Sequence, residues 1–372
     1  MALPQALVEK ALLTGGNSSV AEIVSKVFLT SSTGAIDDAI GNTFFGINHR
    51  QTPAAIQNNK DYFGLTFFTR PDLNLSDANL RTVRQFSPLL NKESKSLQRI
   101  IRCTLGPRLA KDSPAVTSPF VDPGSPFISF LSNHLLSMSG WPDMEAPTYT
   151  SPEGIYKEAF SMIDGVVRNM TTYDITANFR NLPGDPVTLL FMTWLHYASR
   201  TYLGEMVPYP NYIVRNEYDY NTRIYRLVLD PSKRFIQKIA ACGAAFPTNA
   251  PIGAAFNFEA DKPLNQGLDQ VSITFRAMGA EYNDPILFDE FNRTVEDFNP
   301  AMEAKFRSQY YTQIPYAALP IFNNRGYPHI NLNSGELEWY IGIDEWNERF
   351  PRWKELIGDM PFKGKMSSPG KK

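Results

Sequence analysis

The sequence offers few residue types at spacings that could catalyse a reaction or hold a metal. Its histidines are far apart in the chain, at His49, His134, His196 and His329. None has a second histidine or a cysteine close by, whereas zinc ligands recur at short, regular spacings such as HExxH or CxxC. The sequence therefore predicts no metal site and no bound cofactor.

Nucleophilic catalysis and nucleotide binding also lack their usual motifs. Cys103 and Cys242 lie in apolar surroundings, "IRCTLG" and "AACGAAF", which predicts buried free thiols. The chain contains no GxSxG, GxxxxGK[ST] or GxGxxG sequence. "DLNLSDAN" resembles a calcium loop but lacks its central glycine and final glutamate. The sequence thus indicates a non-enzymatic protein, and a hydrolase built around His196 or His329 is the weaker alternative.

The segment "FFTRPDLNLS" places charged residues directly after an apolar run. Residues 61–69 read as a strand, in which Phe67 and Phe68 point to opposite faces, so both faces must be covered. Pro71 has no N–H and ends the strand. Arg70 and Asp72 are then fixed at its end, and a guanidinium suits two-pronged pairing with a carboxylate. We expect a structural site where Arg70 bonds an acidic residue of its own or a neighbouring chain.

Composition points to contact surface rather than to nucleic acid or membrane. The chain has 372 residues and a net charge of −2, with 20% charged residues, 13% aromatic residues and 28 prolines. Near-zero net charge gives no bulk attraction for nucleic acid, and no stretch approaches the ~20 apolar residues of a membrane span. Many aromatic residues and few charges are typical of permanent subunit interfaces.

Residues 77–205 read as a mainly helical, proline-rich insertion. Helix starts with a capping side chain, most of them followed by proline, are predicted at Asp77, Ser125-Pro126, Ser151-Pro152 and Asp185-Pro186. The last of these begins the apolar run "VTLLFMTWLHYASR".

A β module is predicted from residues 61–76 together with 206–299. Residues 223–229 read as a strand, and Asp230-Pro231 then begins a helix that ends at Gly243. Residues 254–259 and 271–278 alternate between apolar and polar residues, which predicts an antiparallel hairpin. Its expected core residues are Phe256, Phe258, Ile273 and Phe275. The loop between its strands offers Pro263, Leu264 and Leu268 as contacts for a neighbour.

The two ends of the chain differ in composition from the segments between them. Residues 1–60 are small and polar and read as an extended N-terminal arm. In residues 300–372, Trp339, Trp346 and Trp353 recur every seven residues, which predicts one helical packing face and a candidate interface. The last residues, "FKGKMSSPGKK", read as a frayed basic tail.

Several segments together resemble virion structural proteins of tailed phages. They are "GLTFFTRPDLNLS", "SPLLNKES", "DYNTRIYRLVLDPSKRFIQKIAACGAAFPTNAPIGAAFNFE" and "VSITFRAMGAEYNDP". More narrowly, the chain is similar to baseplate and tail-tube-initiator proteins of contractile, myovirus-type tails, over residues 40–290.

The resemblance implies an α+β fold with a tail-tube-like antiparallel β-sandwich or barrel module and a flanking helix. It implies self-assembly into a six-fold ring in a virion, put together in the host cytoplasm, with tail tube, baseplate hub or sheath proteins as neighbours. The chain is about twice the size of a simple tube subunit, which favours the initiator ring. The alternative is a virion protein of the neck or tail terminus.

Overall fold

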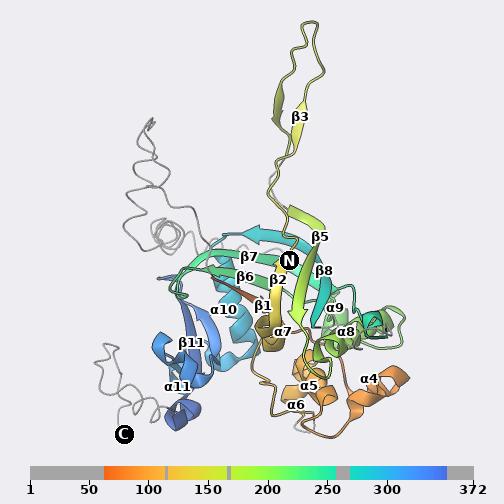
Figure 1. The fold of residues 1–372 in the computed structure, drawn as a ribbon, viewed down its shortest axis with the longest axis vertical. Helices are drawn as coiled ribbons and strands as arrows, with labels where there is room; N and C mark the ends of the chain where they lie inside the picture. Colours follow the sequence, from red (N-terminus) through yellow and green to blue (C-terminus); the bar gives the residue numbers. More distant parts are fainter. Residues whose placement is uncertain (1–62, 114–115, 166–168, 257–268, 350–372) are drawn as a thin grey trace, which may run out of the picture.

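A six-stranded antiparallel sheet is the centre of the fold. The computed structural model describes residues 63–113, 116–165, 169–256 and 269–349. The strands follow the order β1-β6-β7-β8-β5-β2 across a strongly curved sheet (Figure 1). Their bounds are β1 Phe63–Phe68, β2 Leu135–Ser139, β5 Asn169–Arg180, β6 Ile224–Leu229, β7 Ile236–Pro247 and β8 Gln270–Tyr282.

Strand β1 lies between two hydrophobic cores, as the two adjacent phenylalanines predict. Phe68 points into the first core, where its ring centroid lies 5.6 Å from that of Phe275 and 5.8 Å from that of Phe179. Phe67 points to the opposite face, 4.9 Å from Phe127 and 5.1 Å from Phe291. The prediction that both faces of this strand are covered is confirmed.

Helices cover the first core, under β5 and β8. The largest is α8 (Pro186–Tyr202), whose Phe191, Trp194 and Tyr197 are fully buried. The helix predicted to start at Asp185-Pro186 is present, with Pro186 in its first turn. Asp185 has a left-handed backbone, however, and its side chain makes no capping hydrogen bond. The remaining helical elements before β6 are α4 Asp77–Arg81, η2 Arg84–Leu90, α5 Leu97–Leu105, α6 Pro107–Asp112, α7 Ser129–His134 and α9 Pro210–Arg215.

Helix α10 (Ile286–Phe298) covers the second core, against β1, β6 and β7. A three-stranded sheet of order β10-β11-β9 packs beside it. Its strands are β9 Tyr311–Gln313, β10 Tyr327–Ile330 and β11 Leu337–Gly342. Short helical turns complete the described chain: η3 Gly253–Phe256, η4 Pro300–Met302, α11 Arg307–Tyr310 and η5 Tyr316–Phe322. Mixed helices and antiparallel sheets make this an α+β fold, as predicted.

The helix predicted after Asp230 is wrong, because this segment is strand β7. Val228 pairs with Lys238 whereas Leu229 pairs with Ile236, so one extra residue bulges from β7. A bulge shifts the alternation of side chains, and it lets Ile236 and Ile239 enter the same core although they are three residues apart. Apolar residues three positions apart are also typical of one face of a helix, which explains the wrong prediction.

The predicted hairpin of 254–259 with 271–278 is correct only in its second half. Ile273 and Phe275 of β8 are fully buried, but Phe256 lies on a 3₁₀ turn and is 80% exposed. The partners of β8 are β5 and β7, neither of which was its expected partner. Phe258 and the loop with Pro263, Leu264 and Leu268 lie outside the described residues.

Residues 77–205 contain strands as well as helices. The helix expected from Ser151 is instead part of a hairpin of β3 (Thr148–Thr150) and β4 (Ser161–Ile163). Strands β2 and β5 from this segment belong to the central sheet. The helix predicted at 125–135 is only the short α7, since Leu135 already begins β2. Asp77 lies inside α4 rather than at its cap, which is Ser76.

The tryptophans do not share one helical face. Trp339 lies on strand β11 and its ring faces Phe67 at 6.5 Å. Trp346 lies on a helix at 343–349 and stacks on Phe322 at 5.3 Å. Trp353, the basic tail and the N-terminal arm lie outside the described residues.

We expect Phe67→Ala and Phe68→Ala each to lower the free energy of unfolding by about 3–5 kcal/mol, because each removes a ring from a different packed core. Chemical denaturation followed by circular dichroism measures this, with Phe120→Ala, at a ring that is 66% exposed, as the control. A core variant as stable as the control would contradict the two-core arrangement.

Candidate assembly surfaces

Arg70 is a buried structural residue rather than an exposed contact. Its guanidinium donates hydrogen bonds to four backbone carbonyls, those of Cys103 (2.5 Å), Thr104 (2.9 Å), Asp122 (3.0 Å) and Ser125 (3.1 Å). Among the described residues its partners are carbonyl oxygens and no carboxylate pairs with it; the expected ion pair with an acid of its own or a neighbouring chain stays a prediction. Burial lowers the pKa of Arg70 to about 10, which leaves it charged at neutral pH.

Asp72 pairs with a different arginine. Its Oδ2 lies 2.7 Å from a terminal nitrogen of Arg108 and accepts a hydrogen bond from the Tyr212 hydroxyl at 3.3 Å. Phe67, Phe68, Arg70 and Asp72 are all buried within one chain. They position surfaces, but they leave almost no surface of their own for a neighbour.

We expect Arg70→Lys to lower the free energy of unfolding by about 2–4 kcal/mol, because an ammonium cannot reach four carbonyls that stay buried. Thermal and urea denaturation measure this. Arg276→Lys, at an exposed ion pair with Asp174, is the matched control and should change stability by about 0.5 kcal/mol or less. Equal effects of the two substitutions would contradict the structural role of Arg70.

A second buried acid, Asp219, lies in the turn before β6 and contacts helix α8. The Tyr197 hydroxyl donates a hydrogen bond to Oδ2 of Asp219, and the backbone N–H of Asp72 donates to the Asp219 carbonyl at 3.0 Å. Oδ1 of Asp219 has no partner among the described residues. Burial, assisted by the negative charge of Asp72, raises the pKa of Asp219 from 3.8 to about 6.

This pKa shift predicts a pH-dependent stability. Between pH 4 and 6 the folded chain holds a proton on Asp219 that the unfolded chain has released, so the free energy of unfolding falls as pH rises. Two pH units correspond to about 2–3 kcal/mol. Asp219→Asn should remove this part of the pH profile, whereas Asp269→Asn, at an exposed site, should keep it. If the free energy of unfolding of Asp219→Asn varied with pH between 4 and 7 in the same way as that of the parent chain, the prediction would be refuted.

One face of β5 and β8 is bare and mostly polar, with Met278 as an exposed apolar residue on it. Cross-strand pairs on it are Asn178 with Ser272, Thr176 with Thr274, and Asp174 with Arg276, and the last pair forms an exposed ion pair at 3.0 Å. Alternate residues of the same strands, such as Ile273 and Phe275, fill the first core. We call this surface the bare face. Half of the sheet therefore has one solvent-facing side, whereas β1 and β6 are covered on both.

The sheet ends at β2, which has an unpaired outer edge. Among the described strands, β2 pairs with β5 alone. Gly140 follows it with a φ of 100° and lies so close to the Asp174 carbonyl that a Cβ there would be 2.1 Å away. Only glycine fits such a position. Unpaired edges accept strands from other chains unless they are blocked, and Leu136 on this edge is exposed.

Directly after this edge the chain forms a long projection, residues 143–165, which we call the projecting hairpin. Its base is fixed by the Tyr282 hydroxyl, which donates to the Pro142 carbonyl at 2.5 Å, and by Trp141, which packs on Tyr173 and Tyr282. Strands β3 and β4 form a separate two-stranded sheet that extends away from the body of the molecule (Figure 1). A two-stranded ribbon is marginally stable alone.

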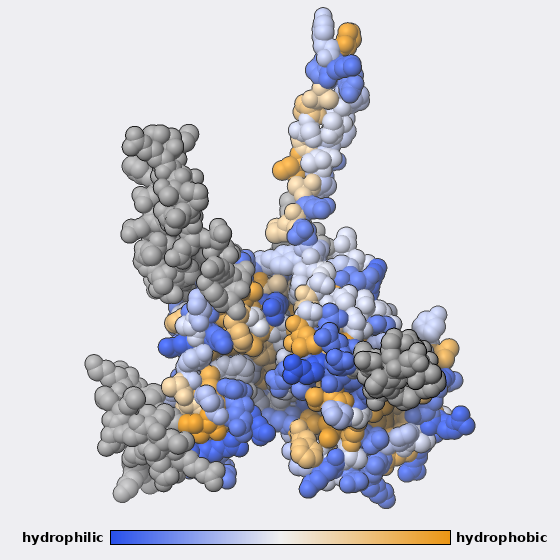
Figure 2. Space-filling view, viewed as in Figure 1, coloured by the Kyte–Doolittle hydropathy of each residue, from blue (hydrophilic) through white to orange (hydrophobic). Residues whose placement is uncertain are grey.

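The projecting hairpin combines exposed apolar side chains with negative charge. Orange and pale orange residues mark its length in Figure 2, and its exposed large apolar residues are Met144, Tyr149, Ile155, Tyr156, Phe160, Met162 and Ile163. Five acidic residues lie beside a single lysine, Lys157. Apolar groups exposed on both sides of a hairpin are typical of a contact surface.

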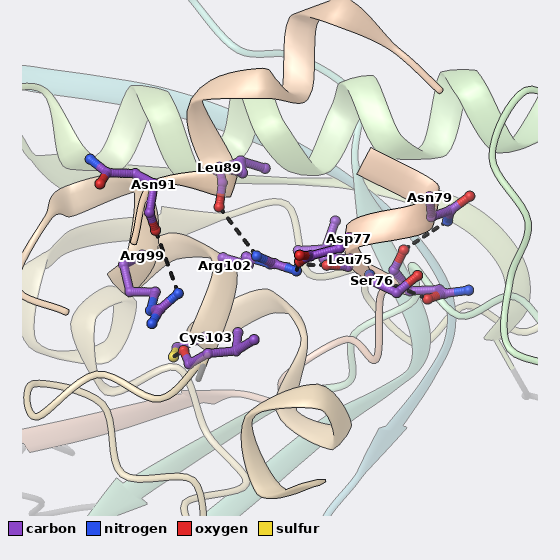
Figure 3. Close-up of polar contacts among 11 residues, drawn as sticks. Leu75, Ser76, Asp77, Asn79, Leu89, Asn91, Arg99, Arg102 and Cys103 are labelled. Carbon is purple, nitrogen blue, oxygen red and sulfur yellow. Dashed lines mark hydrogen bonds and ion pairs between the residues drawn. The ribbon is translucent and has the colours of Figure 1, made fainter. Parts of the chain in front are cut away.

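At the opposite end of the molecule, the region of α4, η2 and the start of α5 exposes cations (Figure 1). We call it the basic end; its exposed cations are Arg81, Arg84, Lys92 and Lys95. Buried Arg102 holds its segments together, because it donates to the carbonyls of Leu75 (2.9 Å) and Leu89 (3.5 Å) and to Asp77 (2.6 Å) (Figure 3).

The basic end continues into an apolar surface after α8. Asn79 and the backbone of Val207 exchange hydrogen bonds of 3.1 and 3.2 Å, and the Thr82 hydroxyl donates to the Glu205 carbonyl at 3.2 Å. These bonds bring the segment of Tyr202, Leu203 and Val207, all more than half exposed, beside α4, which carries Arg81. The surface thus pairs positive charge with apolar area.

The histidines do not form a reactive cluster in the part of the chain that the structure describes. His134 packs on Phe130, and His329 lies 3.8 Å from Glu338, whose carboxylate also accepts bonds from Asn331 and Tyr340. No group of three or more His, Cys, Asp or Glu among the described residues could hold a metal ion. No helix within these ranges is long and apolar enough to cross a membrane.

The chain belongs to a phage tail tube family. The model of the family described as "Putative phage tail tube protein" matches residues 9–354, which is most of the chain. This confirms the predicted resemblance to phage tail structural proteins and defines a structural protein related to the tail tube. The comparison with curated proteins gave no match.

Among solved structures, the chain is similar to three parts of contractile systems. The tube-terminating cap of the anti-feeding prophage is 15% identical, with a TM-score of 0.25, over 40% of this chain and 78% of that one. The sheath/tube terminator of the PVC extracellular contractile injection system is also 15% identical, with a TM-score of 0.23, over 40% and 84%. The PVC sheath-tube complex gives 16%, 0.24, 39% and 78%.

Sequence reasoning missed the projecting hairpin and the basic end. A signal for the hairpin was present, since the β-favouring "TYT" and "FSMI" flank the turn-forming "SPEG". The Ser-Pro-Glu sequence reads equally well as a helix start, and that ambiguity led to the wrong element. For the basic end, the run of cations from Arg81 to Lys95 was visible, but its neighbours after α8 are distant in sequence.

Proposed function

We propose that this chain is a ring-forming structural subunit of a phage tail tube, in which the bare face lines the bore. The observation that carries the proposal is a sheet with one polar solvent-facing side, a packed core on the other side, and an unpaired edge at β2. A closed ring uses all three features.

The free edge gives the ring its closing contact. The sheet ends at β1 on one side and at β2 on the other, so addition of a neighbour's strand at β2 joins unlike surfaces of two copies. Such a heterologous contact closes into a ring when the rotation allows it. Main-chain hydrogen bonds give the affinity, and the bare faces of successive subunits then form one continuous polar wall. A six-fold ring is the stoichiometry we propose.

The place of the ring in the tail is the narrower part of the proposal. A chain with helices and a second sheet outside its central sheet has surfaces for unlike neighbours, which favours an initiator between the baseplate hub and the tube. A ring that repeats along the tube is the second candidate, favoured by the two contrasting ends of the molecule. Stacks of identical rings in the purified protein would distinguish the second candidate from the first.

Labelling of Ser272→Cys tests the bore. Ser272 is exposed on the bare face, and both native cysteines are buried. We expect a small maleimide to label the assembled protein fully and a maleimide on a large polymer to label it at least about tenfold more slowly, because the closed ring admits only the small reagent. The cysteine of Tyr310→Cys, at an exposed residue distant in sequence, should react with both reagents.

A second variant links this protection to the ring. Leu136→Lys with Ser139→Lys places charge on the β2 edge, where lysine opposes strand addition. In the Ser272→Cys background this pair should leave a monomer in sedimentation velocity and restore labelling by the large reagent. Rings that form normally despite the two lysines, or a Ser272→Cys that the large reagent labels equally fast in rings and monomers, would refute the proposal.

A further inference from the structure

We propose that Arg226 on strand β6 is the centre of an oxyanion site that takes a carboxylate or phosphate group. Alternate residues of a strand share a face, so Arg226 lies on the side of Ile224, which belongs to the first core. Tyr225 and Leu227 face α10 on the other side. The site is separate from the bare face and needs no ring to exist, so the inference goes beyond the proposed function.

Arg226 is a half-buried cation without an acidic partner among the described residues. Its Nη1 donates a hydrogen bond of 2.8 Å to the Thr66 hydroxyl, which is neutral. Burial lowers the pKa of Arg226, whereas a carboxylate beside it would raise that pKa. Arg223, just before the same strand, is different, because it pairs with Glu290 of α10 at 2.5 Å. Buried charges are normally paired, so Arg226 has an open position for an anion.

The guanidinium of Arg226 is held in place before any ligand binds. A Cβ on Gly64 would lie 2.3 Å from its Nη2 and 2.5 Å from its Cζ, so the group rests directly against the backbone of Gly64. The hydroxyl of Thr66, a residue only 3% exposed, fixes Nη1 from the side. Such preorganisation lowers the entropy lost on binding.

One edge of this guanidinium is free for a two-pronged contact. Nε and Nη2 of Arg226 donate to no group among the described residues, and neither is sealed from solvent. These two N–H groups lie on the same edge and point in parallel. That geometry matches two oxygens of a carboxylate or a phosphate, which defines the class of ligand.

The neighbours of Arg226 across the sheet leave room beside it. One row of residues in register crosses four strands: Thr66, Arg226, Ala240 and Tyr282. Ala240 separates Arg226 from Tyr282, so the strands of these two long side chains are about 10 Å apart, which is two strand spacings. Between them stands only a methyl group, and Ala240 is half-buried rather than covered.

The surroundings add a second cation on one side and aromatic rings on the other. Lys238 lies in the adjoining row, where it pairs with Val228. Trp141 packs on Tyr282 with ring centroids 6.2 Å apart, and its indole N–H has no acceptor among the described residues. A ligand beside Arg226 thus meets positive charge and an aromatic wall. This combination fits an oxyanion carried on an apolar or planar group.

Titration with inorganic phosphate tests the site in the full-length chain carrying Leu136→Lys and Ser139→Lys, which we call the monomer. We expect sodium phosphate to raise the melting temperature of the monomer in a saturable way, beyond the effect of sodium chloride at equal ionic strength. Arg226→Gln should raise the half-saturating phosphate concentration at least about tenfold, because a charged two-pronged contact is lost.

Gly64→Ala separates the position of the guanidinium from its charge. The added methyl group displaces the guanidinium of Arg226 while the charge stays, so we expect phosphate binding to weaken at least about tenfold here too. Arg215→Gln, at an exposed arginine of α9, is the matched control and should bind phosphate like the parent monomer. The melting temperature of each variant in chloride alone shows whether its fold is intact.

Assembled parent protein distinguishes two sources of the oxyanion. If the ligand is a free anion, rings should bind phosphate with the same half-saturating concentration as the monomer. If an acidic side chain of a second copy fills the site, rings should bind phosphate at least about tenfold more weakly, because the site is already occupied. In that case Arg226→Gln should also lower the fraction of chains found in rings by sedimentation velocity.

Several results would overturn the inference. Phosphate and chloride could act alike on the parent monomer, or Arg226→Gln or Gly64→Ala could bind phosphate as the parent does. A loss of binding in Arg215→Gln equal to that in Arg226→Gln would show an adventitious ion only. Each of these measurements uses the monomer and leaves the ring proposal standing. Absence of rings in the parent protein would instead overturn the proposed function, with phosphate binding by the monomer unaffected.

Discussion

The packing of Phe67 and Phe68 on opposite faces of β1 is the contact on which the rest of the structure depends. Phe68 joins the core under α8, and Phe67 joins the core under α10. One short strand therefore connects two separately packed halves of the chain. Arg70 continues this connection, because its guanidinium gathers the carbonyls of Cys103, Thr104, Asp122 and Ser125 around the end of the strand.

This arrangement leaves the other half of the sheet with one solvent-facing side. Where β1 and β6 are covered on both faces, β5 and β8 keep one polar side, and β2 keeps an unpaired edge. The half with β1 and β6 is packed within the single chain, whereas the half with β5, β8 and β2 keeps solvent-facing surface. Membership of the tail tube family agrees with this division.

The projecting hairpin and the basic end are features of the chain that a ring alone does not explain. A ring needs contacts around its circumference, whereas these two surfaces lie along the long axis of the molecule.

The sequence by itself determined the fold class, the strand at 63–68 with its two covered faces, strand β8 and helix α8, because apolar periodicity and Pro-based helix starts are local signals. It also indicated the tail-tube family. Only the tertiary structure decided that 236–247 is a strand, since a bulge relative to β6 places Ile236 and Ile239 in one core. It also decided that Arg70 bonds carbonyls rather than a carboxylate, and that Trp339 and Trp346 lie on different elements. Each of these depends on a partner distant in sequence, which local patterns do not specify.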